Sequence, residues 1–482
     1  MKTEKIERNL TMLVDFYELA MANGYFKNGF KDTVGIFDMF YRSNPDNGGF
    51  VIMAGVEQLT EYLSSLSFSP EDIDYLRGKG FCEEFLNYLK NFEFKCDVWA
   101  VPEGTPVFPG ETLVKVRGPI IQAQMIETML LICINHQSLI ATKANRIVRA
   151  AQGRAVMEFG SRRAQGCDGA VYGARAACMA GCVGTACVIC DEMFGAPALG
   201  TMAHSWVQLF DSEYDAFKAF ASEYPDNCTL LVDTFNVLKS GVPNAIRVFD
   251  EVLKPLGKRP KGIRIDSGDI TYLSKKARKM LDEAGYEDCG ICASNSLDEY
   301  IIRDMLLQGA KINSFGVGER LITSSSSPVL GGVYKLCGIE SGSKVIPKIK
   351  LSENVQKITT PGNKEVYRIY DNATGKATAD LIALADEKID FTKPLELFDP
   401  EYTWKKKVVT DYTVRKLLEP LFEKGRFVGE KKSLLQLKEY CGEQIDTLWD
   451  EVKRFENPHN YYVDLTKKLW KLKNKMIEEN KF

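Results

Sequence analysis

The chain has 482 residues, of which 45% are hydrophobic and 26% are charged, and its formal net charge is −3. This length exceeds a single ordinary domain, so roughly two or three domains are expected. The small net charge gives no electrostatic reason to expect nucleic acid or an anionic membrane as a partner. The longest apolar run, Met129 to Ile134, is far too short for a membrane span, and the N-terminal segment lacks the apolar core of a signal peptide. We therefore expect a cytoplasmic protein.

Residues 1–140 are predicted to form an α/β domain rich in antiparallel strands. The segment 9–26 has apolar residues at helical spacing, and Tyr17 lies on the apolar face of this helix. A tyrosine in that position is typical of a core or an interface. Strand-like segments separated by turns follow, as in 95–119, and they favour an antiparallel meander. A long helix is then expected up to about residue 151.

Strand-like and helical segments alternate through residues 141–325. The repeating units are about 25 to 35 residues long and their helices are often closed by glycine, as in βαβ crossovers. About six or seven such units in a row favour a closed or nearly closed barrel over an open sheet. Because the strands are short and uneven, we predict an irregular α/β barrel. Within it, we expect Asp168 to cap a helix, CVGTACVIC (182–190) to form a strand and GTMAH to end the next strand at His204.

The C-terminal part of the chain divides by composition at about residue 399. Residues 326–398 contain strand-like segments with clear turn signals, and we expect these strands to return to the N-terminal domain. Residues 399–482 are more charged, and 433–455 is typical of a helix. A mainly helical C-terminal appendage is therefore expected.

The chain contains 13 cysteines, and the pairs Cys187/Cys190 and Cys289/Cys292 have CxxC spacing. A zinc site is not favoured, because both pairs fall in strand-like apolar runs where alternate side chains face opposite directions. These thiols are more typical of small core residues. The sequence by itself therefore predicts no direct set of metal ligands.

Polar residues gather where the predicted strands end, which is where function concentrates in parallel α/β proteins. Adjacent arginines in the glycine-flanked turn Ser161–Arg163 favour a phosphate site over a solvated surface loop. The other strand ends supply Phe159, Thr185, His204, Asp233, Arg264, Asp266, Ser294, Asn295, Gly316 and Gly318. Arginines and backbone N–H groups bind phosphates, and aspartates accept hydrogen bonds from ribose hydroxyls or hold Mg²⁺, although each aspartate could instead be a helix cap. The set fits a phosphorylated sugar.

Several motifs resemble those of the nicotinate phosphoribosyltransferase family. In chain order they are DFYELAMANGY, NHQSLIATKANR, FGSRRAQG, GTMAHSWV, VDTFNVLKSGVPNAI, IRIDSGD and FGVGERLITSSSSPVLGGVYKL. The resemblance spans about residues 9 to 340, and nothing specific is recognised beyond about residue 400. It implies a type II phosphoribosyltransferase, with an irregular barrel beside an N-terminal α/β domain and a homodimeric assembly. The implied reaction joins nicotinate to phosphoribosyl pyrophosphate, with coupled ATP hydrolysis, and gives nicotinate mononucleotide and pyrophosphate for NAD salvage.

The resemblance also implies roles for individual residues. His204 matches a histidine that ATP phosphorylates transiently, Phe159 matches an aromatic residue on one face of the pyridine ring, and Tyr17 matches the residue that covers the other face from the partner subunit. The other matches are Arg162, Arg163 and Arg264 near phosphate and the nicotinate carboxylate, Asp266 at the ribose, and Ser294, Asn295, Gly316 and Gly318 around the 5′-phosphate. We add Ser161 and Thr185 as substrate contacts and assign catalysis to His204, Asp233 and Asp266. Mg²⁺ is expected with the pyrophosphate near the two aspartates.

Three other functions stay open on the sequence. A nicotinamide phosphoribosyltransferase is the main enzymatic alternative; nicotinamide-using relatives carry an acid where this chain has Ala186, which favours nicotinate. A non-catalytic ligand-binding barrel would be expected to lose His204, Asp266 or the Ser161–Arg163 turn, and all are present. An unrelated metal-dependent hydrolase would need clustered ligands, but His204 is the only histidine in the predicted barrel.

Overall fold

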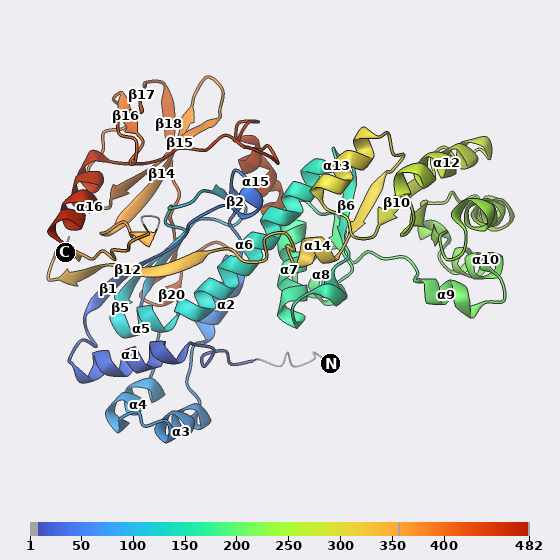
Figure 1. The fold of residues 1–482 in the computed structure, drawn as a ribbon. Coiled ribbons are helices and arrows are strands. Elements are labelled where there is room, and N and C mark those ends of the chain that lie inside the picture. Colours follow the sequence, from blue (N-terminus) through green and yellow to red (C-terminus); the bar gives the residue numbers. More distant parts are fainter. Residues whose placement is uncertain (1–7, 355–356, 481–482) are drawn as a thin grey trace. The chain divides into compact units, whose positions relative to one another are not determined.

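The computed structural model describes residues 8–354 and 357–480, which form two compact units (Figure 1). The first unit runs up to Leu139, resumes over Val329–Lys432 and continues from Glu439. The second unit comprises Ile140–Pro328 and Ser433–Lys438. The chain therefore groups into two units, where the sequence predicts four regions.

A seven-stranded antiparallel sheet lies at the centre of the first unit. In spatial order its strands are β13 (Lys344–Pro347), β12 (Gly332–Ser341), β1 (Val34–Tyr41), β5 (Val114–Pro119), β3 (Asp97–Ala100), β19 (Glu419–Glu423) and β20 (Arg426–Phe427). The sheet packs into a large apolar core, in which Phe37 of β1 stacks on Tyr334 of β12 with ring centroids 4.9 Å apart. Of the predicted region 326–398, β12 lies beside β1 in this sheet.

Helices from the N-terminal part of the chain also belong to the first unit. They are α1 (Phe16–Lys27), α2 (Val56–Ser65), α3 (Pro70–Gly78), α4 (Glu83–Lys90) and α5 (Ile120–Met125), and α6 (Glu127–Ala150) begins there. The start of α3 follows from local sequence: the Ser69 hydroxyl accepts from Asp72 N, the Asp72 carboxylate accepts from Ser69 N, and Pro70 occupies the first turn.

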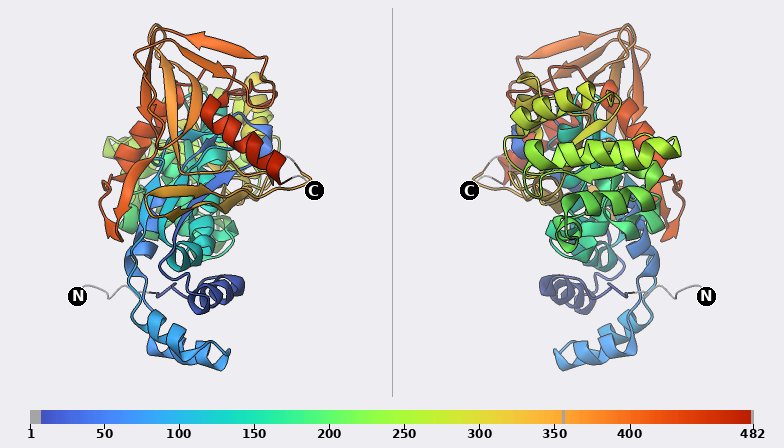
Figure 2. Two further views of the ribbon diagram at one scale, coloured as in Figure 1. Left: turned by 90° about the vertical axis from the view of Figure 1, so that its left-hand side faces the viewer. Right: turned by 90° about the vertical axis from the view of Figure 1, so that its right-hand side faces the viewer.

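A second sheet in this unit has the order β18 (Tyr412–Lys416), β14 (Lys364–Asp371), β15 (Ala377–Leu384) and β21 (Val463–Leu465). Two short antiparallel pairs join β2 (Val51–Ile52) to β4 (Pro106–Val107) and β16 (Leu395–Phe398) to β17 (Lys406–Val409). The remaining helices are α15 (Leu434–Asp446), which extends across the unit boundary in the chain, and α16 (Lys467–Glu479), which contacts β15 (Figure 2).

The C-terminal region differs from the expected helical appendage. It contains α15 and α16, but β19 pairs with β3 of the central sheet and β21 pairs with β15. Charged residues on the solvent-facing positions of these strands mask their alternating pattern in the sequence. The region is therefore built into the sheets of the first unit.

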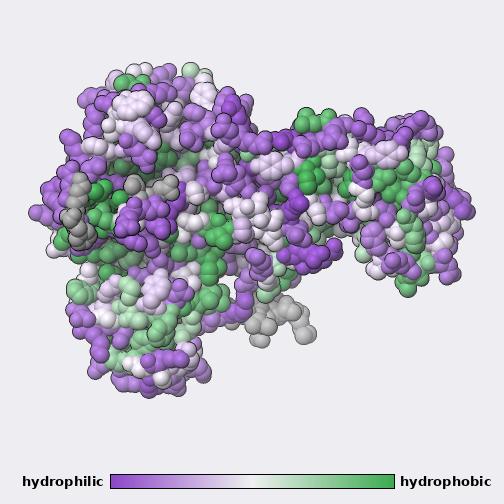
Figure 3. Space-filling view, in the orientation of Figure 1, coloured by the Kyte–Doolittle hydropathy of each residue, from purple (hydrophilic) through white to green (hydrophobic). Residues whose placement is uncertain are grey.

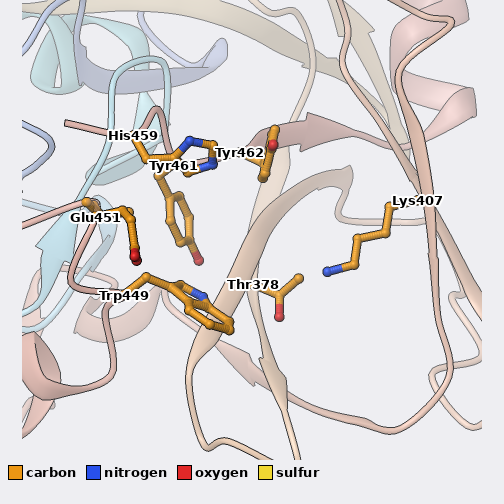
Figure 4. Close-up of a pocket in the computed structure, with 8 residues that line it drawn as sticks. Thr378, Lys407, Trp449, Glu451, His459, Tyr461 and Tyr462 are labelled. Carbon is orange, nitrogen blue, oxygen red and sulfur yellow. The ribbon is translucent and has the colours of Figure 1, made fainter. Parts of the chain in front are cut away.

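The surface of the molecule has a mixed character. Figure 3 shows hydrophilic residues over much of one face, with hydrophobic residues in separate patches. A pocket of about 300 Å³ in the first unit is lined by Thr378, Lys407, Trp449, Glu451, Val452, His459, Tyr461 and Tyr462 (Figure 4). None of the predicted site residues lines this pocket. Among the described residues, no helix combines the length and apolar character needed to cross a membrane.

The second unit is built on a six-stranded parallel sheet. In spatial order the strands are β7 (Gly184–Thr185), β6 (Ala155–Glu158), β11 (Ser314–Val317), β10 (Gly290–Ser294), β9 (Gly262–Ile265) and β8 (Thr229–Leu231). The helices are α7 (Cys167–Met179), α8 (Val188–Phe194), α9 (His204–Leu209), α10 (Glu213–Glu223), α11 (Val242–Val248), α12 (Ile270–Glu283), α13 (Glu299–Leu307) and α14 (Glu319–Ile322). The alternation of strand and helix predicted from the sequence is thus present.

The sheet has the strand order of a ring that is not closed. β6 pairs with β7, β8 to β11 pair in chain order, and β11 pairs with β6, but no ladder joins β7 to β8 in the described parts of the chain. The chain between β7 and β8 forms α8, α9 and α10. The strand expected at GTMAH is the one that is missing, because His204 begins α9 instead of ending a strand.

Two further local predictions are corrected. The strand expected over 182–190 is limited to Gly184–Thr185, and the chain then turns into α8, so Cys187 and Cys190 lie at the start of a helix. Helix α7 begins at Cys167 after Gly166, which has a φ of 95°. Asp168 therefore lies inside the first turn of α7 and does not cap it. A glycine can adopt this positive φ without strain, which explains the earlier start.

Candidate active site

The carboxyl ends of the parallel strands bring most of the predicted residues to one edge of the sheet. Phe159 follows β6, Thr185 ends β7, Asp233 follows β8, Arg264 lies in β9, Ser294 ends β10, and Gly316 and Gly318 lie in and after β11. Adjacent strands are in parallel register here, with Ser294 opposite Gly316 and Glu158 opposite Thr185. The sheet thus collects into one place residues that are far apart in the chain.

Arg264 is the centre of this set. Its guanidinium donates from Nε to Ser294 Oγ (2.8 Å), from one terminal nitrogen to Thr201 Oγ1 (3.1 Å) and from the other to an Asp266 carboxylate oxygen (2.9 Å). The guanidinium also lies 5.8 Å from the centroid of the Phe159 ring. A fixed, planar cation beside an aromatic ring suits a flat ligand that carries a carboxylate.

The two aspartates form a connected acidic group next to Arg264. One Asp233 oxygen accepts from the backbone N–H of Asp266 (3.0 Å) and from Ser267 Oγ (2.6 Å). The other Asp233 oxygen is buried and has no hydrogen-bond partner among the described residues. A buried carboxylate oxygen without a partner is costly unless a ligand hydroxyl or a cation completes it.

Asp266 is held in its ionised form. Burial raises the pKa of Asp266, but the hydrogen bonds from Ser294 and Arg264, together with the charges of Arg264 and His204, outweigh burial and lower it. Asp266 is therefore a carboxylate at neutral pH and can accept hydrogen bonds from sugar hydroxyls. Asp269, by contrast, caps α12 by accepting from Tyr272 N.

Phe159 is positioned by two glycines of β11 and the loop after it. A Cβ at Gly316 would lie 2.5 Å from the Phe159 ring, and a Cβ at Gly318 would lie 3.0 Å from the Phe159 carbonyl oxygen. These close approaches explain glycine at both positions. The two residues predicted as phosphate-loop glycines therefore also fix the aromatic ring.

The Ser161–Arg163 segment forms a short 3₁₀ turn after Phe159. Arg163 N donates to Gly160 O (2.7 Å), and both arginine side chains are exposed. Arg163 makes a long contact of 3.8 Å to Glu319. The Ser161 hydroxyl is buried without a hydrogen-bond partner in the described residues. The exposed guanidinium groups of Arg162 and Arg163, and the Ser161 hydroxyl, could therefore bind an anion.

Thr185 is placed differently from the prediction. Its side chain is fully buried. Its hydroxyl donates to Glu158 Oε2 (2.6 Å) and accepts from Cys187 N (2.9 Å). The hydroxyl is therefore used inside the protein and is not presented to a ligand. Glu158 itself was missed in the sequence, since a carboxylate within a strand-like run carries no motif of its own.

His204 contacts a residue that follows Asp233. Its Nδ1 lies 3.2 Å from Thr234 Oγ1. His204 is half-buried at the first residue of α9. Thr201, three residues earlier, is a second residue that the sequence did not single out, although it lies in the GTMAH motif and bonds to Arg264.

The loop after β10 has a strained backbone. Asn295 and Ser296 have φ values of 93° and 25°, which non-glycine residues rarely adopt. Such conformations persist where surrounding structure imposes them, often at functional sites. The loop lies next to Ser294 at the end of β10, and its role as a phosphate loop stays a prediction.

Tyr17 belongs to the first unit and lies in α1. Tyr17 is 46% exposed, and its neighbours Leu13 (44%) and Phe16 (60%) are exposed too. Burial, with the negative charges of Glu127 and Glu18, raises the pKa of Tyr17, so its hydroxyl stays protonated. Tyr17 is therefore not a core residue, and its contact with a partner subunit stays a prediction.

Comparison with known proteins decides the family. Models of the N-terminal domain, the central family region and the C-terminal domain of nicotinate phosphoribosyltransferases match residues 12–135, 154–380 and 363–473. The chain is 42% identical over 476 residues to the nicotinate phosphoribosyltransferase of Bacillus subtilis, an alignment that covers 98% of this chain and 96% of that protein.

The chain belongs to the nicotinate phosphoribosyltransferase family.

Other known proteins also resemble this chain over most of its length. The Mycobacterium tuberculosis protein named nicotinate phosphoribosyltransferase pncB2 is 37% identical, with 92% of this chain and 89% of that protein covered. The crystal structure of human nicotinic acid phosphoribosyltransferase superposes with a TM-score of 0.84 at 26% identity, over 96% of this chain and 100% of that one. The nicotinate-nucleotide pyrophosphorylase of Pyrococcus furiosus gives a TM-score of 0.70 at 25% identity, over 93% and 99%.

The residues of this family member fit a magnesium ion that is bound together with a phosphorylated ligand. No group of three or more His, Cys, Asp or Glu side chains in the described residues is arranged to hold a metal by itself. Mg²⁺ usually takes one or two carboxylates and completes its shell with phosphate oxygens and water. The unpartnered oxygen of Asp233 and the ionised Asp266 match that donor set.

Proposed function

We propose that this chain joins nicotinate to phosphoribosyl pyrophosphate, giving nicotinate mononucleotide and pyrophosphate. We further propose that ATP hydrolysis is coupled to this reaction through transient phosphorylation of His204. The observation that carries the proposal is the grouping of Arg264, Phe159 and Asp266 at the strand ends of one parallel sheet. This grouping supplies a cation for a carboxylate, a flat face for a ring and an acceptor for sugar hydroxyls.

The pyridine ring is proposed to bind against Phe159 with its carboxylate toward Arg264. Stacking on an aromatic ring contributes about 0.5–1.5 kcal/mol beyond burial, and the ion pair selects the acid over the amide. Ala186 offers no acceptor for an amide group, which also favours nicotinate. Tyr17 is proposed to cover the other ring face from the partner subunit of a homodimer in the cytoplasm.

The sugar is proposed to bind across Asp233 and Asp266, with phosphates at the glycine and arginine turns. Asp233 and Asp266 would hold Mg²⁺ together with the oxygens of the pyrophosphate. The ion would place positive charge next to the leaving group. Arg162 and Arg163 add charge from the protein side, and Ser294, Asn295, Gly316 and Gly318 surround the 5′-phosphate. Cleavage at the ribose C1 builds oxocarbenium character, so these groups act by orientation and by stabilising the departing anion.

His204 is proposed as the phosphorylated residue. If Nδ1–H donates to Thr234, the lone pair of Nε2 is left to attack the γ-phosphorus of ATP. The N–P bond then forms as the bond to ADP breaks, and water later cleaves the phosphohistidine to phosphate. The added negative charge would order neighbouring loops around bound substrate. The sheet around this site is proposed to act as an incomplete barrel that is open between β7 and β8.

Steady-state assays with both pyridines test this proposal directly. Mononucleotide formation is measured from phosphoribosyl pyrophosphate with nicotinate or nicotinamide, each with and without ATP. We expect kcat/KM for nicotinate to exceed that for nicotinamide by at least about a hundredfold, since the amide cannot form the charged pair with Arg264. ATP is expected to raise the nicotinate rate. Equal turnover of the two pyridines would assign the chain to the alternative activity, and no turnover of either would leave a ligand-binding role.

A further inference from the structure

Glu158 is a fully buried carboxylate that the proposed reaction does not use. It ends β6, is 0% exposed, and both of its oxygens are occupied. Oε1 accepts from the backbone N–H of Gly160, and Oε2 accepts from the Thr185 hydroxyl at 2.6 Å. Burial raises the pKa of Glu158, and the hydrogen bonds from Thr185 and Gly160 oppose that rise. A buried carboxylate is costly unless it is paired in this way, so its contacts indicate its role.

The two contacts of Glu158 lead to different segments of the site. Gly160 begins the turn that carries Arg162 and Arg163, and its carbonyl accepts from Arg163 N at 2.7 Å. Thr185 ends β7, and its hydroxyl accepts from Cys187 N at 2.9 Å where the chain turns toward α8. The Glu158 carbonyl also accepts from Ala186 N at 2.8 Å. One residue therefore holds both segments.

The turn is packed directly on this carboxylate. A Cβ at Gly160 would lie 2.7 Å from Glu158 Oε1 and 2.6 Å from Ile322 Cβ. The backbone N–H of Gly160 thus approaches the carboxylate with no space for a side chain between them. Rotation of the turn would break this contact and expose the carboxylate to its apolar surroundings.

Glu158 offers no positive charge for direct contact with an anion. Its contribution to anion binding must therefore come through orientation of the turn that it holds. We propose that Glu158 is a positioning residue which, together with Thr185, fixes the Ser161–Arg163 turn in the orientation that binds the pyrophosphate end of the substrate. This inference rests on the proposed function for the identity of the anion.

Binding of inorganic pyrophosphate to the full chain tests the inference without requiring turnover. Calorimetric titrations compare wild type with Glu158→Gln, Thr185→Val, the double variant and Thr185→Ser. We expect pyrophosphate to bind about tenfold more weakly to each of the first two, because each disturbs a hydrogen bond to a charged group. Thr185→Ser retains the hydroxyl and is expected to stay within about twofold of wild type. The double variant is expected to lose about as much as either single variant, since both act on one contact.

Steady-state kinetics provides a readout that a purely structural role would not give. KM for phosphoribosyl pyrophosphate is expected to rise about tenfold in Glu158→Gln and Thr185→Val while kcat changes by less than about twofold. The proposal is overturned if a folded Glu158→Gln protein binds pyrophosphate as tightly as wild type does. It is also overturned if the losses of affinity multiply in the double variant, or if Thr185→Ser loses as much affinity as Thr185→Val. If Glu158→Gln does not fold, the comparison of Thr185→Val with Thr185→Ser tests the proposal without it. If the variants change pyrophosphate affinity as expected but wild type forms no mononucleotide, only the proposed function is contradicted. If wild type does not bind pyrophosphate, this inference is contradicted.

Discussion

Arg264→Met is expected to lower kcat/KM for nicotinate by at least about a hundredfold. The substitution removes two charge-assisted hydrogen bonds to the proposed carboxylate ligand, each contributing about 1.5–3 kcal/mol. It also leaves Asp266, Ser294 and Thr201 without their shared donor. Turnover of nicotinamide, which forms no ion pair, is expected to fall much less. The ratio of the two kcat/KM values is therefore the measurement.

Arg259→Met is the matched control for this substitution. Arg259 lies in the same unit, but its side chain is half exposed and pairs with Asp288 on the surface. Exposed ion pairs contribute little, so kcat/KM is expected to stay within about twofold of wild type. If Arg264→Met reduced both pyridines equally, the guanidinium would support the site without recognising the carboxylate.

His204→Ala is expected to abolish the stimulation by ATP while leaving slower, ATP-independent synthesis. The imidazole is the proposed phosphate acceptor, and the proposed sugar and pyridine contacts are made by other residues. Incubation with ATP labelled at the γ-phosphate is expected to give an acid-labile phosphoprotein in wild type and none in the variant. Initial rates with and without ATP complete the comparison.

His459→Ala serves as the control for His204→Ala. His459 lies in the first unit, next to Tyr462, and none of the site residues contacts it in the described structure. It is expected to keep both the labelling and the response to ATP. A His204→Ala protein that responded to ATP as wild type does would remove this histidine from the mechanism.

The sequence predicted the alternation of strands and helices in the second unit because each short apolar run and each glycine-closed helix is a local signal. It did not predict the opening of the sheet. The segment GTMAH has the apolar and small residues of a strand, yet the chain begins α9 at His204. Whether such a segment pairs with a neighbour is decided by tertiary contacts, which a local pattern does not record.

The prediction of a helical C-terminal appendage was incomplete for a related reason. Strands β17 to β20 are largely exposed, so charged residues occupy many of their positions and conceal the period of two. Pairing of β19 with β3 joins residues more than 300 positions apart in the chain. Contacts over that separation are invisible in the sequence of either segment.

The predicted site residues stay a prediction, but the strand ends bring several of them together, because motif residues follow the strands that position them. Arg264, Asp266 and Ser294 are brought together as expected. The Thr185 hydroxyl, predicted as a substrate contact, bonds to Glu158 in this structure. Neither Glu158 nor the bond from Arg264 to Thr201 has a spacing that identifies it. Supporting contacts of this kind appear only once the strands are in register.

A crystal structure of the chain with nicotinate mononucleotide and pyrophosphate tests the central claim most directly. We predict the pyridine ring against Phe159, its carboxylate within hydrogen-bond distance of Arg264, and the ribose hydroxyls beside Asp233 and Asp266. Product bound elsewhere, with Phe159 and Arg264 making no contact to it, would contradict the account.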